Sequence, residues 1–496
     1  MKKIFSKSVI IVMVMGFLSS SCSDDFLNTL PTEDVSASSV TATTANLMLG
    51  INGIHRSLYL RFNSQGEGGL GGMMIMTDML GEDLVMTTTG NGWYNATYRW
   101  IDHTNANDGD NLYHYRVYYR FIRNANVIIN GADAAVGDTN ERNVAKGQAL
   151  FYRAFSHFQL VQLYGGRYVG GQTNSQLGVP IRLTATNEPL ARATVEEVYA
   201  QVNTDLDEAI SLLSSYSRPN KSHIDAKVAT GLKARVALVQ QNYPLAAQLA
   251  AAARTGFTLM DNATYQLGFN DYTNPEWMWG SHIIEDQTIF FANFGAYMSR
   301  NFSSTNIRTN PKAIFSVLYN QIPASDVRSK IFDPTGQHLN LPPGATLPSN
   351  FAKFPFTSQK FIAVSTADSR MDVPYMRMAE MFLIEAEALS FSNEAAARQA
   401  LFQLVSKRDP SYTLSTKSGQ ALKDEIEFQR RIELWGEGFR FYDLKRLNKA
   451  LDRTGGNHTA ALTGNVFQVP AGATSWQWLI PQNELNSNPL VVQNPN

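Results

Sequence analysis

The chain has 496 residues, of which 44% are hydrophobic, 11% aromatic and 17% charged. This composition is typical of an ordered globular protein and excludes a disordered chain. The formal net charge of −1 argues against a nucleic-acid-binding protein, because that class needs a basic surface.

Residues 1–21 predict a secretory signal peptide. Three lysines precede the apolar stretch Val9–Leu18, and three serines follow it. As a helix this stretch would be roughly 15 Å long, whereas the hydrocarbon core of a membrane is about 30 Å thick. We therefore expect a cleaved signal and not a membrane span. Its removal takes away the three lysines and no acidic residue, which makes the net charge about −4.

Cys22 is the only cysteine and directly follows the serines. We expect it to be the lipidation site of an anchored protein, because each buried CH₂ of an acyl chain contributes about 0.8 kcal/mol. The alternative is a plain secreted protein with a free thiol. Residues 22–45, which are polar and rich in Ser and Thr, predict a tether between the lipid and the folded body.

The body, residues 46–496, is predicted to be mainly α-helical. Apolar residues recur every three or four positions from Thr194 to Leu213, which indicates one face of a helix. Thr194 and Glu197 have the spacing of a capping box. A second apolar helix face runs from Ala229 to Val239, so the two helices should form an antiparallel hairpin.

Further helices predict a scaffold of stacked hairpins. The hairpins are rich in small residues and resemble tetratricopeptide repeats, although the consensus of that repeat is absent. Long segments without helical periodicity interrupt them, and these are expected on the surface, where sites usually form. The helices are 111–130 with 141–164, 376–391 with 394–406, and 423–434; the irregular segments are 60–110, 261–374 and 455–496.

The stretch from Trp93 to Phe121 is unusually aromatic, with nine aromatic residues among 29. Exposed rings can stack on the apolar faces of sugars while polar side chains bind the hydroxyl groups. The alternative is that these rings fold inward beneath their loop. The predicted aromatic platform is Trp93, Tyr94 and Trp100, and its predicted polar partners are Asn91, Asn95, Arg99 and Asp102.

A second aromatic cluster lies between Trp277 and Tyr297. Trp277 and Trp279 have the spacing of one face of a strand and are expected to pack against the helices. Phe290 and Tyr297 lie in an irregular segment and are the better ligand-binding candidates. Phe291 and Phe294 belong to the same cluster.

Motifs for catalysis or metal binding are weak or absent. The GxGxxG of residues 66–71 follows a predicted helix instead of a strand, so it indicates chance or a flexible loop more than a dinucleotide site. Adjacent carboxylates such as Glu82 and Asp83 do not face each other as a glycosidase pair must. We therefore predict no catalytic residues, metal or cofactor, and a binding protein instead of an enzyme.

Four segments of the chain are distinctive: 24–32, 149–165 (ALFYRAFSHFQLVQLYG), 430–446 (RRIELWGEGFRFYDLKR) and 480–495. Together they resemble the SusD/RagB family of outer-membrane nutrient-uptake lipoproteins of Bacteroidetes. The resemblance covers essentially the whole mature chain, in order. It implies a single SusD-like body with an N-terminal part of about 46–240 and a C-terminal part of about 260–496. Asp24 and Asp25 also resemble the signal that places such lipoproteins on the cell surface.

The segment 430–446 alternates charges of opposite sign and also contains aromatic residues. Such a pattern favours an ion-pair network that holds the late helices against the core. A ligand site is the less favoured interpretation. The charged members are Arg430, Arg431, Glu433, Glu437, Arg440 and Asp443, and the aromatic members are Trp435, Phe439 and Phe441.

The resemblance implies a lipid-anchored protein on the outer face of the outer membrane. It would capture oligosaccharide as the lid of a SusC-like TonB-dependent barrel, with the region around Trp93 helping to line the ligand face. A RagB-like protein that takes up oligopeptides is the nearest alternative. A surface glycosidase or peptidase, and a structural lipoprotein without a ligand, also remain open.

Overall fold

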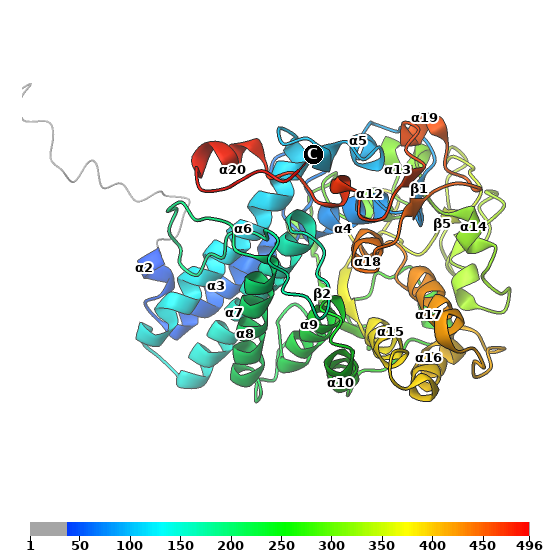
Figure 1. Ribbon diagram of the computed structural model, residues 1–496. Coiled ribbons are helices and arrows are strands. Elements are labelled where there is room, and N and C mark those ends of the chain that lie inside the picture. The colour runs from blue at the N-terminus through cyan, green and yellow to red at the C-terminus, as the bar shows by residue number, and fades with distance from the viewer. Residues whose placement is uncertain (1–36, 496) are drawn as a thin grey trace, which may run out of the picture.

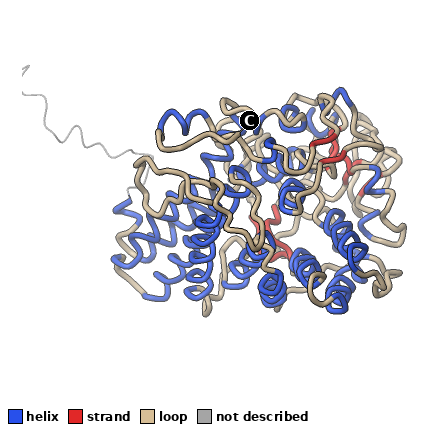
Figure 2. Tube along the Cα trace, in the orientation of Figure 1, coloured by secondary structure: helices blue, strands red, loops and turns tan. Residues whose placement is uncertain are grey.

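The computed structural model describes residues 37–495. The predicted signal peptide, Cys22 and the first part of the tether lie outside the described residues. Helices dominate the described region and strands are short, which confirms the prediction of a mainly α-helical protein (Figure 2). No helix in residues 37–495 has the length and apolar character needed to cross a membrane.

Nine helices of the described region form the scaffold along one side of the molecule (Figure 1). Neighbouring helices in the chain pack against each other, so the predicted hairpins are present. The N-terminal six are α3 (Thr44–Ser57), α6 (Gly109–Gly131), α7 (Thr139–Tyr164), α8 (Val195–Leu212), α9 (Ala226–Val239) and α10 (Tyr243–Ala253). The later three are α15 (Met378–Leu389), α16 (Glu394–Arg408) and α17 (Gly419–Glu433).

Polar side chains at the N-termini explain where several helices begin. The predicted capping box of α8 is present: Thr194 Oγ1 accepts a hydrogen bond from the Glu197 amide, and the Thr194 amide donates to Glu197 Oε2 at 2.8 Å. Asp108 and Asp138 cap α6 and α7 without a return bond, each accepting from two backbone amides.

The remaining chain folds over the scaffold as loops with short elements (Figures 1 and 2). The short helices are α2 (Ala37–Val40), α4 (Gly69–Met79), α5 (Asn95–Tyr98), α11 (Asn262–Tyr265), α12 (Gly295–Met298), α13 (Thr305–Thr309), α14 (Ser316–Tyr319), α18 (Arg440–Arg446), α19 (Ala460–Thr463) and α20 (Gln482–Ser487). The 3₁₀ turns are η2 (Asp102–Thr104), η3 (Ala132–Ala134), η4 (Glu285–Gln287), η5 (Val327–Ser329) and η6 (Thr474–Trp476).

The strands form three small antiparallel sheets. One has the order β1 (Leu84–Met86), β3 (Lys312–Ile314), β5 (Thr357–Ser358) and β4 (Phe332–Asp333). The others pair β2 (Trp277–Ser281) with β6 (Val373–Arg377), and β7 (Leu451–Asp452) with β8 (Gln468–Val469). Trp279 on β2 is buried against Phe151 and Phe155 of α7, which confirms that this strand packs on the helices.

Helix α4 was not expected, because the sequence predicts an irregular segment there. All of its residues are buried, so it has no polar face to reveal a helical period. The GxGxxG at its start is also not a flexible loop. Gly69 has φ +62°, and a Cβ there would lie 2.2 Å from the Leu58 carbonyl oxygen. Close packing against neighbouring chain therefore requires this glycine.

Eight buried charges of the described region connect the loops to the scaffold, and we call them the buried ion network. Four are cationic and four anionic, so the group is formally neutral: Arg328, Lys360, Arg377 and Arg408, with Glu276, Asp326, Glu433 and Glu437. Arg377 contacts both Glu433, at 3.0 Å, and Glu437, at 2.6 Å. Burial disfavours the charge of Glu433, but its arginine neighbours hold the pKa of that carboxyl far below its usual range.

Most other charges of segment 430–446 also form ion pairs. Arg431 contacts Asp83, Arg440 contacts Glu82, and Arg430 contacts Asp443 at 2.7 Å. The prediction that this motif builds an ion-pair network is therefore confirmed. The adjacent carboxylates of residues 82 and 83 are partners in it.

Removing one network charge should be far more damaging than removing an exposed one. We predict that Glu433→Ala lowers the free energy of unfolding by about 3–5 kcal/mol, because Arg377 and Arg408 lose a buried partner. Urea unfolding of the mature chain measures this. The exposed Glu285→Ala variant serves as the control and should stay within about 0.5 kcal/mol of the wild type. Equal effects of the two substitutions would contradict the prediction.

Candidate functional site

The loop before Trp93 is held in place by hydrogen bonds to residues 309–311. Asn310 Oδ1 accepts from the amides of Thr87 and Thr88, both at 3.3 Å. Thr88 Oγ1 donates to the Thr309 carbonyl at 2.9 Å. At the other end of the loop, the buried hydroxyl of Tyr94 donates to the Gly66 carbonyl at 2.8 Å. The backbone that presents Trp93 is thus fixed on both sides.

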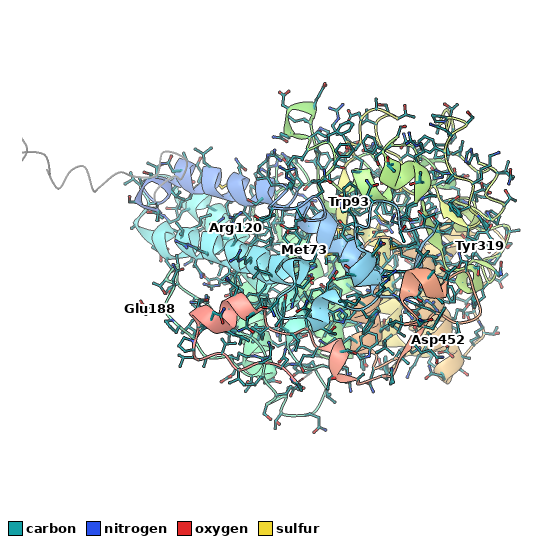
Figure 3. All side chains as sticks on the ribbon, turned by 90° about the horizontal axis from the view of Figure 1, so that it is seen from above. Met73, Trp93, Arg120, Glu188, Tyr319 and Asp452 are labelled. Atoms are coloured by element: carbon teal, nitrogen blue, oxygen red, sulfur yellow. The ribbon has the colours of Figure 1, made fainter. Side chains whose placement is uncertain are left out.

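Trp93 is half-buried, and its ring meets Tyr297 edge-on at a centroid distance of 5.2 Å. Tyr297, on α12, is buried, and its hydroxyl donates to the Gln65 carbonyl at 2.6 Å. In the view of Figure 3, Trp93 lies between Arg120 on α6 and the loops around Tyr319. Trp93 therefore offers part of its ring at the surface above a fixed tyrosine.

Two further rings lie exposed on the segment before α12. Phe290 is 49% exposed and Phe291 38% exposed. Their centroids are 4.5 Å apart, and Phe290 also contacts the buried Phe302 at 5.1 Å. The hydroxyl of Ser369 donates to the Phe290 carbonyl at 2.7 Å, which fixes the backbone of this segment. The rings thus form two groups around α12: Trp93 above Tyr297, and Phe290 and Phe291 above Phe302. We call the two groups together the aromatic surface.

Tyr94, Trp100 and Tyr297 do not offer exposed rings, so that part of the sequence prediction is wrong. Trp100 is only 6% exposed, and its Nε1 donates to the Leu80 carbonyl at 3.0 Å. Trp476, far along the chain, covers it edge-on at 4.8 Å. Tyr94 and Tyr297 pack against each other at 5.1 Å and support the aromatic surface from below.

The predicted polar partners divide into two pairs. Asn91 is exposed and Asn95 half-buried, and both lie beside Trp93 in the sequence. Arg99 instead binds the carbonyls of Ala461 and Leu462 of α19, and the buried Asp102 accepts from Thr97 Oγ1 at 2.5 Å. These contacts of Arg99 and Asp102 are within the fold. Phe291 is exposed beside Phe290, and its place in the irregular segment 290–297 is the signal for it in the sequence.

Among the described residues, the carboxylates of Asp102, Asp108 and Asp110 have oxygen atoms within 4.8 Å of one another, close enough to hold a metal ion. Burial, followed by repulsion from Asp102, raises the pKa of Asp110 to about 7. Burial likewise raises the pKa of Asp102 to about 6. Asp108 also caps α6. Bound protons can therefore relieve the repulsion without an ion.

Two family models match consecutive parts of the chain. A model described as "Starch-binding associating with outer membrane" matches residues 63–238, and the SusD family model matches residues 248–496. No curated protein sequence matches the chain.

Solved structures share the fold over most of its length. A SusD-like carbohydrate binding protein from Bacteroides vulgatus ATCC 8482 has a TM-score of 0.79 and 25% identity, covering 91% of this chain and 97% of its own. A SusD superfamily protein from Bacteroides thetaiotaomicron VPI-5482 has a TM-score of 0.78 and 24% identity, covering 92% and 100%. A laminarin-binding SusD-like protein has a TM-score of 0.70 and 21% identity, also covering 92% and 100%.

Trp100 is a buried ring and Phe290 a surface ring, so their substitutions should have different effects on the free energy of unfolding. We predict that Trp100→Ala lowers the free energy of unfolding by about 3–5 kcal/mol, because it leaves a cavity and removes a buried hydrogen bond. Phe290→Ala should lower it by less than about 1 kcal/mol, because half of that ring is already in water. A Phe290 effect as large as that of Trp100 would contradict this prediction.

Proposed function

Because the chain belongs to the SusD family, we propose that it captures an oligosaccharide at the cell surface and delivers it to a SusC-like TonB-dependent barrel in the outer membrane. The aromatic surface is the observation that carries this proposal. Phe290 and Phe291 are exposed, and Trp93 is partly so, although burial of such rings is normally favourable. Exposed rings grouped on loops indicate a surface that is covered by a ligand.

The chemistry of the aromatic surface suits a sugar. The C–H faces of a sugar ring can lie on flat aromatic rings, and amides such as those of Asn91 and Asn95 can bond the hydroxyl groups. Tyr297 and Phe302 hold the surface rings from below, so little side-chain freedom is lost on binding. The family description as starch-binding and the similar proteins described as carbohydrate-binding and laminarin-binding support the same ligand class.

Binding without bond chemistry is the role that we propose. A glycosidase needs two carboxyl groups free to act on its substrate. Glu82 and Asp83 are buried and ion-paired with Arg440 and Arg431 instead. The cell-surface location rests on the predicted lipidation of Cys22. The predicted tether of residues 22–45 is too long, because α2 and the start of α3, where Thr44 is buried, belong to the folded body. The family description as associating with the outer membrane supports this location.

A binding comparison tests the aromatic surface directly. We predict that Phe290→Ala combined with Phe291→Ala weakens binding of the mature chain to its glycan at least about tenfold, because two stacking rings are lost. Affinity electrophoresis against a panel that includes laminarin and starch identifies a retained glycan, and calorimetry then measures the affinity of each variant.

The exposed Leu339→Ala variant is the matched control, since it removes apolar surface from another loop and should bind like the wild type. Unchanged glycan binding by the double phenylalanine variant would contradict the proposal. Retention of oligopeptides with no glycan bound would favour the RagB-like alternative.

A further inference from the structure

The exposed arginines of the described region all lie in one part of the molecule. They are Arg61, in the loop after α3, and Arg116, Arg120 and Arg123 on α6. Before Asn130, every exposed side chain of α6 is one of these arginines. Residues three and four positions apart share a helix face, and the Cα atoms of the three α6 arginines span about 10 Å of it. We call the four residues the arginine surface.

Neutral groups hold the three α6 arginines in place. The guanidinium of Arg120 lies over the Phe62 ring, 4.9 Å from its centre. Asparagine side chains of α20 and of the loop before α8 accept from Arg116 Nη2, at 3.0 Å, and from Arg123 Nη1, at 3.5 Å. Within residues 37–495 these arginines form no ion pair. The guanidinium groups are thus positioned while their charges stay uncompensated.

Acidic residues nearby do not neutralise these charges. The helix α6 and the segments that touch its arginines contain four of them: Glu67, Asp110, Glu188 and Glu484. Glu67 is buried and accepts from a backbone amide, and Glu484 accepts from an asparagine at the end of α20. Burial raises the pKa of Asp110 to about 7, so this carboxyl is only partly charged at neutral pH. Figure 3 shows Glu188 on the opposite side of Arg120 from Trp93.

The arginine surface adjoins the aromatic surface through the loop that follows α3. Arg120 lies over Phe62 of this loop, and Tyr297, beneath Trp93, donates to the Gln65 carbonyl at 2.6 Å. Phe62 and Gln65 are three residues apart, which is at most about 11 Å of extended chain. An elongated ligand can therefore touch both surfaces at once.

We propose that the glycan captured by this protein is anionic and that the arginine surface binds its carboxylate or sulfate groups. This inference rests on the proposed function, in which the aromatic surface binds the sugar rings. A guanidinium presents paired N–H donors that match the oxygen atoms of such groups, which neutral glucans lack. The mature chain has a net charge of about −4, so attraction of a polyanion must come from a local surface and not from the whole molecule.

Calorimetry with the mature chain compares charged polysaccharides with their neutral counterparts. The probes are polygalacturonate with its methyl-esterified form, and dextran sulfate with dextran. At least one charged polymer should bind about tenfold more tightly than its neutral counterpart, and the one that does so identifies carboxylate or sulfate as the recognised group. Added salt should weaken this binding, because it screens the charges. No preference for either charged polymer would overturn the proposal.

Substitutions locate the bound anionic groups. Replacing all three α6 arginines by glutamine should weaken binding of the charged polymer about tenfold, because three exposed charge contacts are lost. Replacing them by lysine should retain most of the affinity. The control variant loses three exposed charges from other surfaces and should bind like the wild type; it replaces by glutamine Lys227, Lys330 and Lys407. Unchanged binding by the arginine-to-glutamine variant, or an equal loss in the control, would overturn the proposal.

The double variant Phe290→Ala, Phe291→Ala separates this inference from the proposed function. Loss of glycan binding in that variant, with none in the arginine-to-glutamine variant, would overturn the arginine surface and leave glycan capture standing. Loss in the arginine-to-glutamine variant alone would support the arginine surface and contradict the aromatic surface. Binding to vesicles that contain phosphatidylglycerol, with no glycan bound, would overturn both.

Discussion

The buried ion network is the constraint on which the rest of the structure depends. Its eight charges come from segments far apart in the chain: residue 276 before β2, residues 326–328, residue 360, the end of β6, the end of α16, and the end of α17 with the turn after it. Desolvating so many charges is tolerable only when every one is paired. The network therefore forms only in one arrangement of the loops on the helical scaffold, and it fixes that arrangement.

The segment that carries Glu437 also connects the network to the loop of Trp93. Glu437 of the network lies between Arg431 and Arg440, which bind the buried Asp83 and Glu82. These acids directly precede β1, whose partner strand β3 follows Asn310. Asn310 in turn holds the loop that presents Trp93. The loop that presents Trp93 is thus tied to the core, and a loop fixed before binding lowers the entropic cost of holding a flexible glycan.

The fold was largely predictable from sequence, because its helices are amphipathic and capped by local residues. The ion-pair role of segment 430–446 was also predictable from its alternating charges, although its partners at residues 82, 83 and 276 were not. Helix α4 was missed because a helix buried on all sides has no polar face. Trp100 and Trp93 look alike in the sequence, and only the distant Trp476, which covers Trp100, separates a core ring from a surface ring. Local sequence cannot contain that information.

A crystal structure of the mature chain soaked with the oligosaccharide that it retains tests the central claim most directly. The account predicts sugar density lying against Trp93, Phe290 and Phe291, with Tyr297 and Phe302 unmoved beneath them. Sugar bound elsewhere, with these three rings free of ligand, would contradict it.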